Sequence, residues 1–86
     1  MFYSVVCHIS SSTGDMISLL NNSRESIISA RNKALGFILK NGGKGAYCIY
    51  ETGENALIYI ETKNICRLED GTILRRMISH DEFEQT

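Results

Sequence analysis

The segment Gly42-Gly43-Lys44-Gly45 has residue types that bind phosphate in other proteins, where a glycine-rich loop exposes backbone N–H groups beside a lysine. A P-loop needs the pattern Gly-x-x-x-x-Gly-Lys-Ser/Thr between a strand and the start of a helix. Here the glycines follow an apolar stretch with helical spacing, and a glycine stands after Lys44 where a hydroxyl residue is needed. Because glycine often ends a helix in the left-handed conformation, we interpret Gly42 and Gly43 as a helix terminus.

Cysteine, histidine and carboxylate side chains are the residue types that could do catalytic or metal chemistry. Cys7 and His8 are adjacent, so on an extended strand they point to opposite faces and cannot form a thiolate–imidazolium pair. The three cysteines and two histidines lack the spacing of a zinc site. No spacing of the acidic residues favours a catalytic pair of carboxylates. The sequence therefore predicts a protein that is not an enzyme and uses no metal or cofactor.

Basic residues are concentrated in one segment of a chain whose formal net charge is -1. Residues 24–44 have a net charge of +4, and the rest of the chain has -5. A solvated helix face usually mixes both signs, and the helix dipole favours basic residues only near the C-terminal end. We predict that this segment binds an anion, either RNA or an acidic protein surface, through Arg24, Arg31, Lys33, Lys40 and Lys44.

The elements that would position these residues follow from the spacing of apolar and turn residues. Asp70-Gly71 is a strong two-residue hairpin signal, and Thr52-Gly53-Glu54 is a second turn between extended stretches. Residues 16–20 are interpreted as a strand, with a single helical turn as the alternative. The expected elements are strands at 2–10, 16–20, 46–51, 55–62, 65–69 and 72–78, a helix at 23–41 capped by Asn22 or Ser23, and a frayed acidic tail at 80–86.

This order predicts a single α+β domain over residues 1–86, with a mostly antiparallel sheet of five or six strands and one principal amphipathic helix packed on one face. The apolar residues of the helix span an arc of roughly 200°. Such an arc is wider than one sheet contact needs, so a second copy of the chain or a folded-over strand would cover part of it. The residues expected in the core are Ile27, Ala34, Leu35 and Ile38 of the helix, with Val5, Ile49, Ile58 and Ile60 of the sheet.

Arg31 lies inside this apolar arc. Burying a guanidinium there without a partner would be costly. The side chain must therefore reach solvent, pair with a carboxylate such as Glu61, or meet a ligand. The sequence leaves a structural role and an anion-binding role for Arg31 both open.

The cysteines Cys7, Cys48 and Cys66 each lie in an apolar run and are widely spaced. We interpret them as buried free thiols in a reducing compartment rather than as a disulfide framework. The longest apolar runs are far shorter than the roughly 20 residues that span a bilayer. The N-terminal residues also lack the basic start of a secretory signal. We therefore expect a cytoplasmic protein that does not interact with membranes.

The order strand, strand, helix and sheet, with Asn-Lys-Ala-Leu at 32–35 in the helix, resembles the small antitoxin-like proteins of T4-type phages, the Dmd- and TifA-like inhibitors of host endoribonuclease toxins. The resemblance covers residues 2 to about 50 as an order of elements, and it carries no functional residue across. It implies a phage early protein that acts in the host cytoplasm. Its partner would be a host toxin RNase, with or without RNA in the complex, and its action would be non-catalytic.

Such an inhibitor has two routes to its target. The basic helix could bind RNA and hold it together with the toxin, or the acidic residues Asp81, Glu82 and Glu84 could mimic phosphate in a basic RNase cleft. The charge of the helix favours the first route. The alternative hypothesis is a homodimeric structural or assembly module that uses the wide apolar helix face, and a general RNA- or single-stranded-DNA-binding accessory protein is a further alternative.

Overall fold

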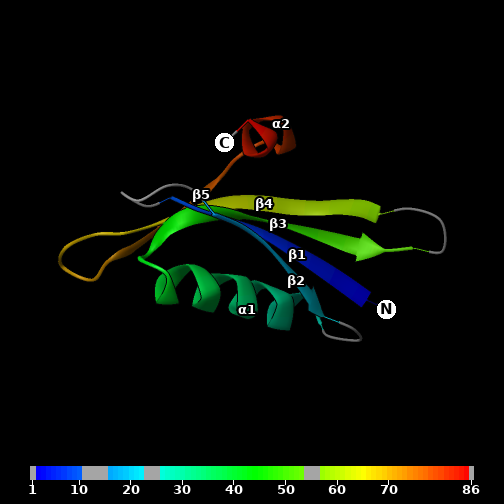
Figure 1. Cartoon of the computed structure of the whole chain (residues 1–86), viewed down its shortest axis with the longest axis horizontal. Coiled ribbons are helices and arrows are strands. Elements are labelled where there is room, and N and C mark those ends of the chain that lie inside the picture. Colours follow the sequence, from blue (N-terminus) through cyan, green and yellow to red (C-terminus); the bar gives the residue numbers. More distant parts are fainter. Residues whose placement is uncertain (1, 11–15, 23–25, 54–56, 86) are drawn as a thin grey trace.

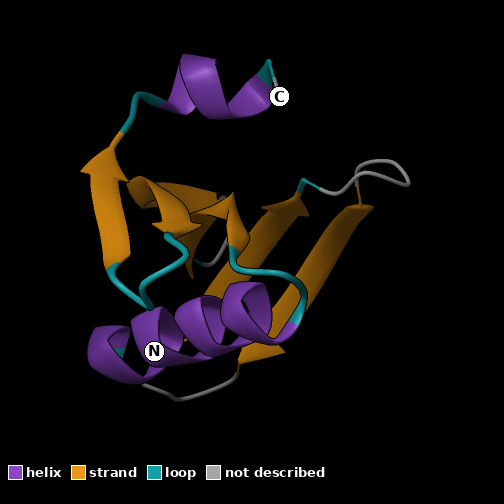
Figure 2. Cartoon of the chain, turned by 90° about the vertical axis from the view of Figure 1, so that its left-hand side faces the viewer, coloured by secondary structure: helices purple, strands orange, loops and turns teal. Residues whose placement is uncertain are grey.

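The computed structural model describes residues 2–10, 16–22, 26–53 and 57–85. Its elements are β1 (Phe2–Ile9), β2 (Met16–Asn22), α1 (Ile27–Lys40), β3 (Lys44–Thr52), β4 (Leu57–Arg67), β5 (Ile73–Met77) and α2 (His80–Glu84). The strands form one antiparallel sheet in the order β2-β1-β3-β4-β5. Helix α1 covers one face of this sheet and the short helix α2 lies over the other (Figure 1 and Figure 2). The predicted α+β class is confirmed, and residues 16–20 belong to a strand as predicted.

Helix α1 begins later than the sequence predicts. Ser26 is its N-cap, because the Ser26 hydroxyl oxygen accepts a hydrogen bond of 3.1 Å from the backbone N–H of Ser29. The predicted cap at Asn22 or Ser23 is therefore wrong. Asn22 belongs to β2, and residues 23–25 lie outside the described part of the chain. Serine is a common capping residue, so several nearby serines and asparagines compete for this role in the sequence.

Helix α1 ends at the two glycines, as the sequence predicts. Gly42 has φ 109° and Gly43 has φ 78°, which are left-handed conformations that favour glycine. The N–H of Gly43 donates a 2.9 Å hydrogen bond to the carbonyl of Ile38 and so satisfies the last turn. A Cβ at Gly43 would lie 2.9 Å from the Cβ of Arg67, so the position also has no room for a side chain.

The main core lies between α1 and the sheet. On the α1 side, Ala30, Ala34 and Ile38 are fully buried, and the two alanines let the helix approach the strands closely. Of the core residues predicted from the sequence, Ala34, Ile38, Val5 and Ile49 are buried, while Ile27, Leu35 and Ile60 are half-buried. The sheet side of this cluster is formed by Val5, Cys7, Ile9, Tyr47, Ile49 and Ile65.

The prediction that Ile58 belongs to the core is wrong, because its exposed fraction is 54%. Strand β4 has 11 residues and α1 has 14. Their lengths are therefore about 36 Å for the strand and about 21 Å for the helix. Because the strand is longer than the helix that covers it, its first residues extend beyond the core.

The segment predicted to be a frayed tail forms the helix α2 within residues 80–84, which corrects that prediction. Ser79 caps α2, since its hydroxyl accepts a 3.0 Å hydrogen bond from the N–H of Glu82. Phe83 is only 3% exposed, and its ring lies 4.2 Å from that of His8 between ring centroids. One aromatic side chain therefore anchors the helix in a second, smaller core with Ala46, Cys48 and Ile78.

Strand β4 joins two segments that the sequence separates into 55–62 and 65–69. Lys63 and Asn64 continue the ladder, and the pairing with β3 shifts register once, between Ile49 and Tyr50. The predicted turn at Asp70-Gly71 links β4 to β5. There the Asp70 carboxylate accepts a 2.9 Å hydrogen bond from the N–H of Thr72, and Gly71 has φ 90°.

The cysteines are free, and Cys7 and Cys48 are buried while Cys66 is half-buried. Burial raises the pKa of the Cys7 thiol to about 12 and also raises the pKa of the Cys48 thiol. The prediction of buried thiols therefore holds for two of the three. Among the described residues, no helix has the length and apolar character needed to cross a membrane.

A candidate anion-binding cleft

A cleft opens between α1 and the β4–β5 side of the sheet, where the helix no longer covers the strands. Its volume is about 140 Å³. Arg31 and Asn32 face it from the helix, and Lys63 and Arg75 face it from the sheet. The remaining lining residues are Ile28, Leu35, Tyr47 and Ile65. The cleft therefore has an apolar floor and polar, mainly cationic walls.

Arg31 and Glu61 form an ion pair at the inner wall of this cleft. Oε1 of Glu61 accepts from Nε of Arg31 at 3.0 Å and from Nη2 at 2.7 Å. Oε2 of Glu61 accepts from Nε at 3.1 Å and from the Tyr47 hydroxyl at 3.0 Å. The structural pair that the sequence left open for Arg31 is therefore present.

The pair is asymmetric in its burial. The side chain of Glu61 is 9% exposed and that of Arg31 is 43% exposed. Burial alone would raise the pKa of Glu61, but the hydrogen bonds from Arg31 and Tyr47 and the charges of Arg31 and Lys63 outweigh it, so this pKa is lowered. Burial raises the pKa of the Tyr47 hydroxyl, and its hydrogen bond to Glu61 adds to the increase. At neutral pH the network thus consists of a guanidinium, a carboxylate and a neutral phenol.

Lys63 and Arg75 lie beside each other on the sheet wall. Ile65 pairs with Arg75 across β4 and β5, and Lys63 pairs with Met77, so the two cations are diagonal neighbours on one face. Within the described residues, no carboxylate lies within ion-pair distance of either cation. The three cations of the cleft therefore have one carboxylate between them, and the local net charge is +2.

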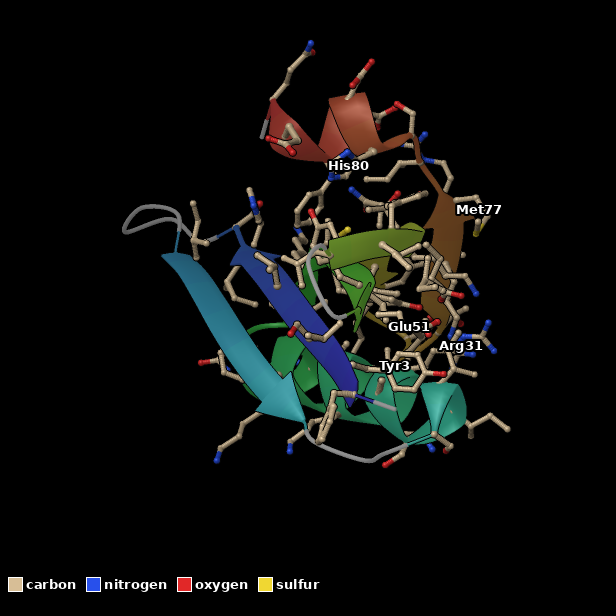
Figure 3. The ribbon with its side chains drawn as sticks, turned by 90° about the vertical axis from the view of Figure 1, so that its right-hand side faces the viewer. Tyr3, Arg31, Glu51, Met77 and His80 are labelled. Carbon is tan, nitrogen blue, oxygen red and sulfur yellow. The ribbon has the colours of Figure 1, made fainter. Side chains whose placement is uncertain are left out.

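Glu51 lies on the same face of the sheet but does not line the cleft. It pairs with Tyr3 near the end of β3, and Figure 3 labels both residues. Met77, also labelled there, lies on β5 and is 62% exposed.

Of the four predicted basic residues that lie in the described part of the chain, one lines the cleft. Arg31 lines the cleft, and Arg24 lies outside the described residues. Residues of an α-helix are about 100° apart, so Lys33 and Lys40 lie on a flank of α1 roughly 160° to 180° away from Arg31. Lys44 shares its sheet face with Ala46, which packs under α2 on the other side of the sheet.

Lys63 and Arg75 are the residues that the sequence reasoning missed. The Asp70-Gly71 turn is only a partial signal, because it predicts the hairpin that contains both residues but not its register. Counting outward from a two-residue loop would pair Ile65 with Arg76, whereas the observed register pairs Ile65 with Arg75, and the N–H of Leu68 donates to the carbonyl of Thr72 across a longer loop.

A second polar cluster lies on the opposite face, under α2. Nε2 of His80 lies 2.7 Å from the Tyr50 hydroxyl and 3.2 Å from Oε1 of Glu84. Burial raises the pKa of Tyr50. Thr62 donates a 2.6 Å hydrogen bond to the carbonyl of Ile78 beneath it. These contacts attach α2 to the sheet.

The described part of the chain gives little support for a metal site or for a nucleophilic side chain with a base beside it. No group of three or more His, Cys, Asp or Glu side chains there could hold a metal ion. Cys7 faces the α1 core while His8 contacts Phe83 under α2, so the two lie on opposite faces as the sequence predicts. A scan against protein-family models and searches of the curated proteins and of the solved structures find no match to this chain.

Proposed function

We propose that this chain is a small non-catalytic protein that binds RNA through the cations of the cleft. The observation that carries the proposal is the convergence of Arg31, Lys63 and Arg75 around one opening, with a single carboxylate that is already hydrogen-bonded. Uncompensated basic side chains on one surface attract phosphate backbones. Such binding needs no nucleophile, metal or cofactor.

The resemblance to phage antitoxin-like inhibitors gives this proposal a biological setting. In that setting the protein would act in the host cytoplasm and hold RNA against a host endoribonuclease toxin. The cleft supports the route through RNA rather than the route through acidic mimicry. Two of the acidic residues proposed for mimicry are engaged within the protein, since Glu82 pairs with Arg76 at 3.0 Å and Glu84 lies 3.2 Å from His80.

The salt dependence of RNA binding tests this function. We expect the affinity for a labelled single-stranded RNA, measured by fluorescence anisotropy, to fall linearly with the logarithm of salt concentration. Lys63→Ala should reduce the slope by about 0.7, the value for one phosphate contact on a single strand. An affinity for RNA that does not change with salt, or a slope that Lys63→Ala leaves unchanged, would contradict the proposal. If the chain bound a toxin RNase in the absence of RNA, its partner would be a protein surface rather than RNA.

A homodimer through the apolar face of α1 is the second candidate function. The observation that favours it is Ile28, which is 64% exposed at the edge of that face. The middle of the arc is covered by the sheet, because Ala30, Ala34 and Ile38 are buried, whereas Leu35 is half-buried. Sedimentation velocity decides the question: a dimer that Ile28→Ser dissociates would support it, and a monomer at micromolar concentration would contradict it.

A further inference from the structure

We infer that the cleft holds one nucleotide unit of an unpaired RNA strand, with its base against Arg31 and Ile28 and its phosphate beside Lys63 and Arg75. This inference rests on the proposed function and narrows it. RNA binding by a charged surface requires only the phosphate backbone, whereas this cleft would also select a single unstacked base. Three features of the cleft carry the argument: its size, the planar group on its helix wall, and the pair of cations on its sheet wall.

The size of the cleft matches one ring system. Its volume is about 140 Å³. An apolar cavity of about 150 Å³ in another protein holds a single benzene ring. A base pair or a duplex groove edge would not enter such a space, whereas one base of a single strand would. The apolar floor of Leu35 and Ile65 would contact the ring without competing for its hydrogen-bonding edge.

The helix wall presents a planar group held in a fixed orientation. Nε and Nη2 of Arg31 are bound to Glu61, and Glu61 is bound in turn by the Tyr47 hydroxyl. This pairing uses one edge of the guanidinium and leaves 43% of the side chain exposed. Arginine planes stack on unpaired bases, and a plane that is already oriented loses less freedom on binding.

Ile28 extends the platform along the helix. It lies one turn before Arg31, so the two side chains are neighbours on the helix surface. It is 64% exposed, which is high for an isoleucine at the rim of an otherwise polar opening. A base seated on Arg31 would cover Ile28 as well, and Asn32 on the same wall offers both a donor and an acceptor to the edge of the base.

The sheet wall supplies the phosphate site. Lys63 and Arg75 are diagonal neighbours across β4 and β5, so their Cα atoms are about 7 to 8 Å apart. One phosphate between the two side chains can bridge this separation. The carboxylate of Glu61, on whose pKa the charge of Lys63 acts, already accepts hydrogen bonds from Arg31 and Tyr47 through its two oxygens. A phosphate would therefore meet two cations and no competing free carboxylate in the cleft.

The test is a titration of the full chain with uridine monophosphate, uridine and inorganic phosphate, followed by NMR chemical shifts. We expect the monophosphate to bind about tenfold more tightly than inorganic phosphate, the size of one base stacked on a planar side chain. Perturbed backbone amides should cluster at residues 28–35, 63–65 and 75. Equal affinities for the monophosphate and for inorganic phosphate would overturn the inference. So would a phosphoserine peptide that binds as tightly as the nucleotide, because it carries no base.

Substitutions test separately the helix wall of the cleft, which would bind the base, and the sheet wall, which would bind the phosphate. Ile28→Ala and Arg31→Lys should bring the affinity for the monophosphate close to that for inorganic phosphate, while leaving phosphate affinity nearly unchanged. Ile28 is exposed, so its variant keeps the fold even if Arg31→Lys does not. Lys63→Ala/Arg75→Ala should abolish phosphate binding. Lys33→Ala/Lys40→Ala removes the same charge from the opposite flank of α1. It should change neither the affinity for the monophosphate nor the affinity for inorganic phosphate.

The same variants distinguish failure of the inference from failure of the proposed function. If RNA binding depends on Lys63 and Arg75 but Ile28→Ala binds both RNA and monophosphate like wild type, the one-nucleotide site is wrong and RNA binding stands. If RNA does not bind at low salt, the proposed function itself fails. Melting curves of each variant confirm that the protein compared is folded.

Discussion

Arg31 of α1 and Glu61 of β4 are joined at the inner wall of the cleft, with Nη2 2.7 Å from Oε1 and Nε within 3.1 Å of both carboxylate oxygens. This pair attaches the helix to the sheet at the point where apolar packing ends. It also holds a cation at the opening of the cleft. A structural role and an anion-binding role for Arg31 are therefore compatible, because the exposed part of the guanidinium is not used by the pair.

Removing the guanidinium tests the structural part of this role. Arg31→Ala should lower the free energy of unfolding by about 1 to 3 kcal/mol, because the buried carboxylate of Glu61 loses its charged donor. Urea denaturation at neutral pH measures the loss. Lys40→Ala, an exposed cation on the same helix, should change stability by less than about 0.5 kcal/mol. A loss for Arg31→Ala as small as that of the control would mean that the pair contributes nothing to folding.

The same pair predicts an acid-sensitive part of the stability. The pKa of Glu61 is lower in the folded protein than its ordinary value of 4.5, so the unfolded chain binds the proton more readily. The stabilisation is therefore fully present above pH 4.5 and is lost as the pH falls through the lowered pKa. Urea denaturation from pH 7 to pH 3 should show this loss in the wild type and a smaller one in Glu61→Gln. Identical acid dependence in both proteins would contradict the assignment.

Two isoleucines that the sequence assigns equally to the core should behave differently. Ile38 is 0% exposed and Ile58 is 54% exposed. Ile38→Ala should therefore cost about 2 to 5 kcal/mol. Ile58→Ala should cost less than about 1 kcal/mol, since little apolar area leaves water there on folding. Equal losses measured by thermal or urea unfolding would mean that the end of β4 is covered in solution.

These differences show which features of the fold can be predicted from local sequence patterns in this chain. Apolar spacing predicted α1 and its contact with the sheet, and an arginine inside an apolar arc pointed to a carboxylate partner such as Glu61. Asp70-Gly71 predicted a hairpin because only a few residue types suit such a turn. The exposure of Ile58 could not be predicted in the same way, because it depends on how far one element extends past another.

The cleft was harder to predict than the fold. Arg31 and the sheet cations Lys63 and Arg75 are far apart in the sequence, and they meet only because β4 is one continuous strand paired with β5. Breaking β4 at residue 63 hid that register. Helix α2 was missed for a related reason, since its docking depends on the burial of Phe83 in a second core rather than on helical periodicity.

The cysteines report on both cores. Cys66 is half-buried and should react first with a thiol reagent, while Cys7 and Cys48 should react only on unfolding, because burial raises their pKa. Phe83→Ala should undock α2 and make Cys48 reactive in the native protein, while Cys7 beneath α1 stays protected. Rates followed with a chromogenic disulfide measure this. Unchanged protection of Cys48 in Phe83→Ala would show that α2 is not what covers it.

Two charge-matched double variants test most directly whether RNA binds at the cleft, as we propose, and not along the outer flank of α1. Both lose two positive charges, so a general effect of net charge is the same for each. In anisotropy titrations with one labelled single-stranded RNA, we expect Lys63→Ala/Arg75→Ala to weaken binding strongly and to reduce the salt slope by at least about 0.7, the value for the one phosphate that the two cations would share. Lys33→Ala/Lys40→Ala should bind nearly as the wild type does. A larger loss of RNA affinity in Lys33→Ala/Lys40→Ala, or an equal loss in both variants, would contradict the assignment of the site to the cleft.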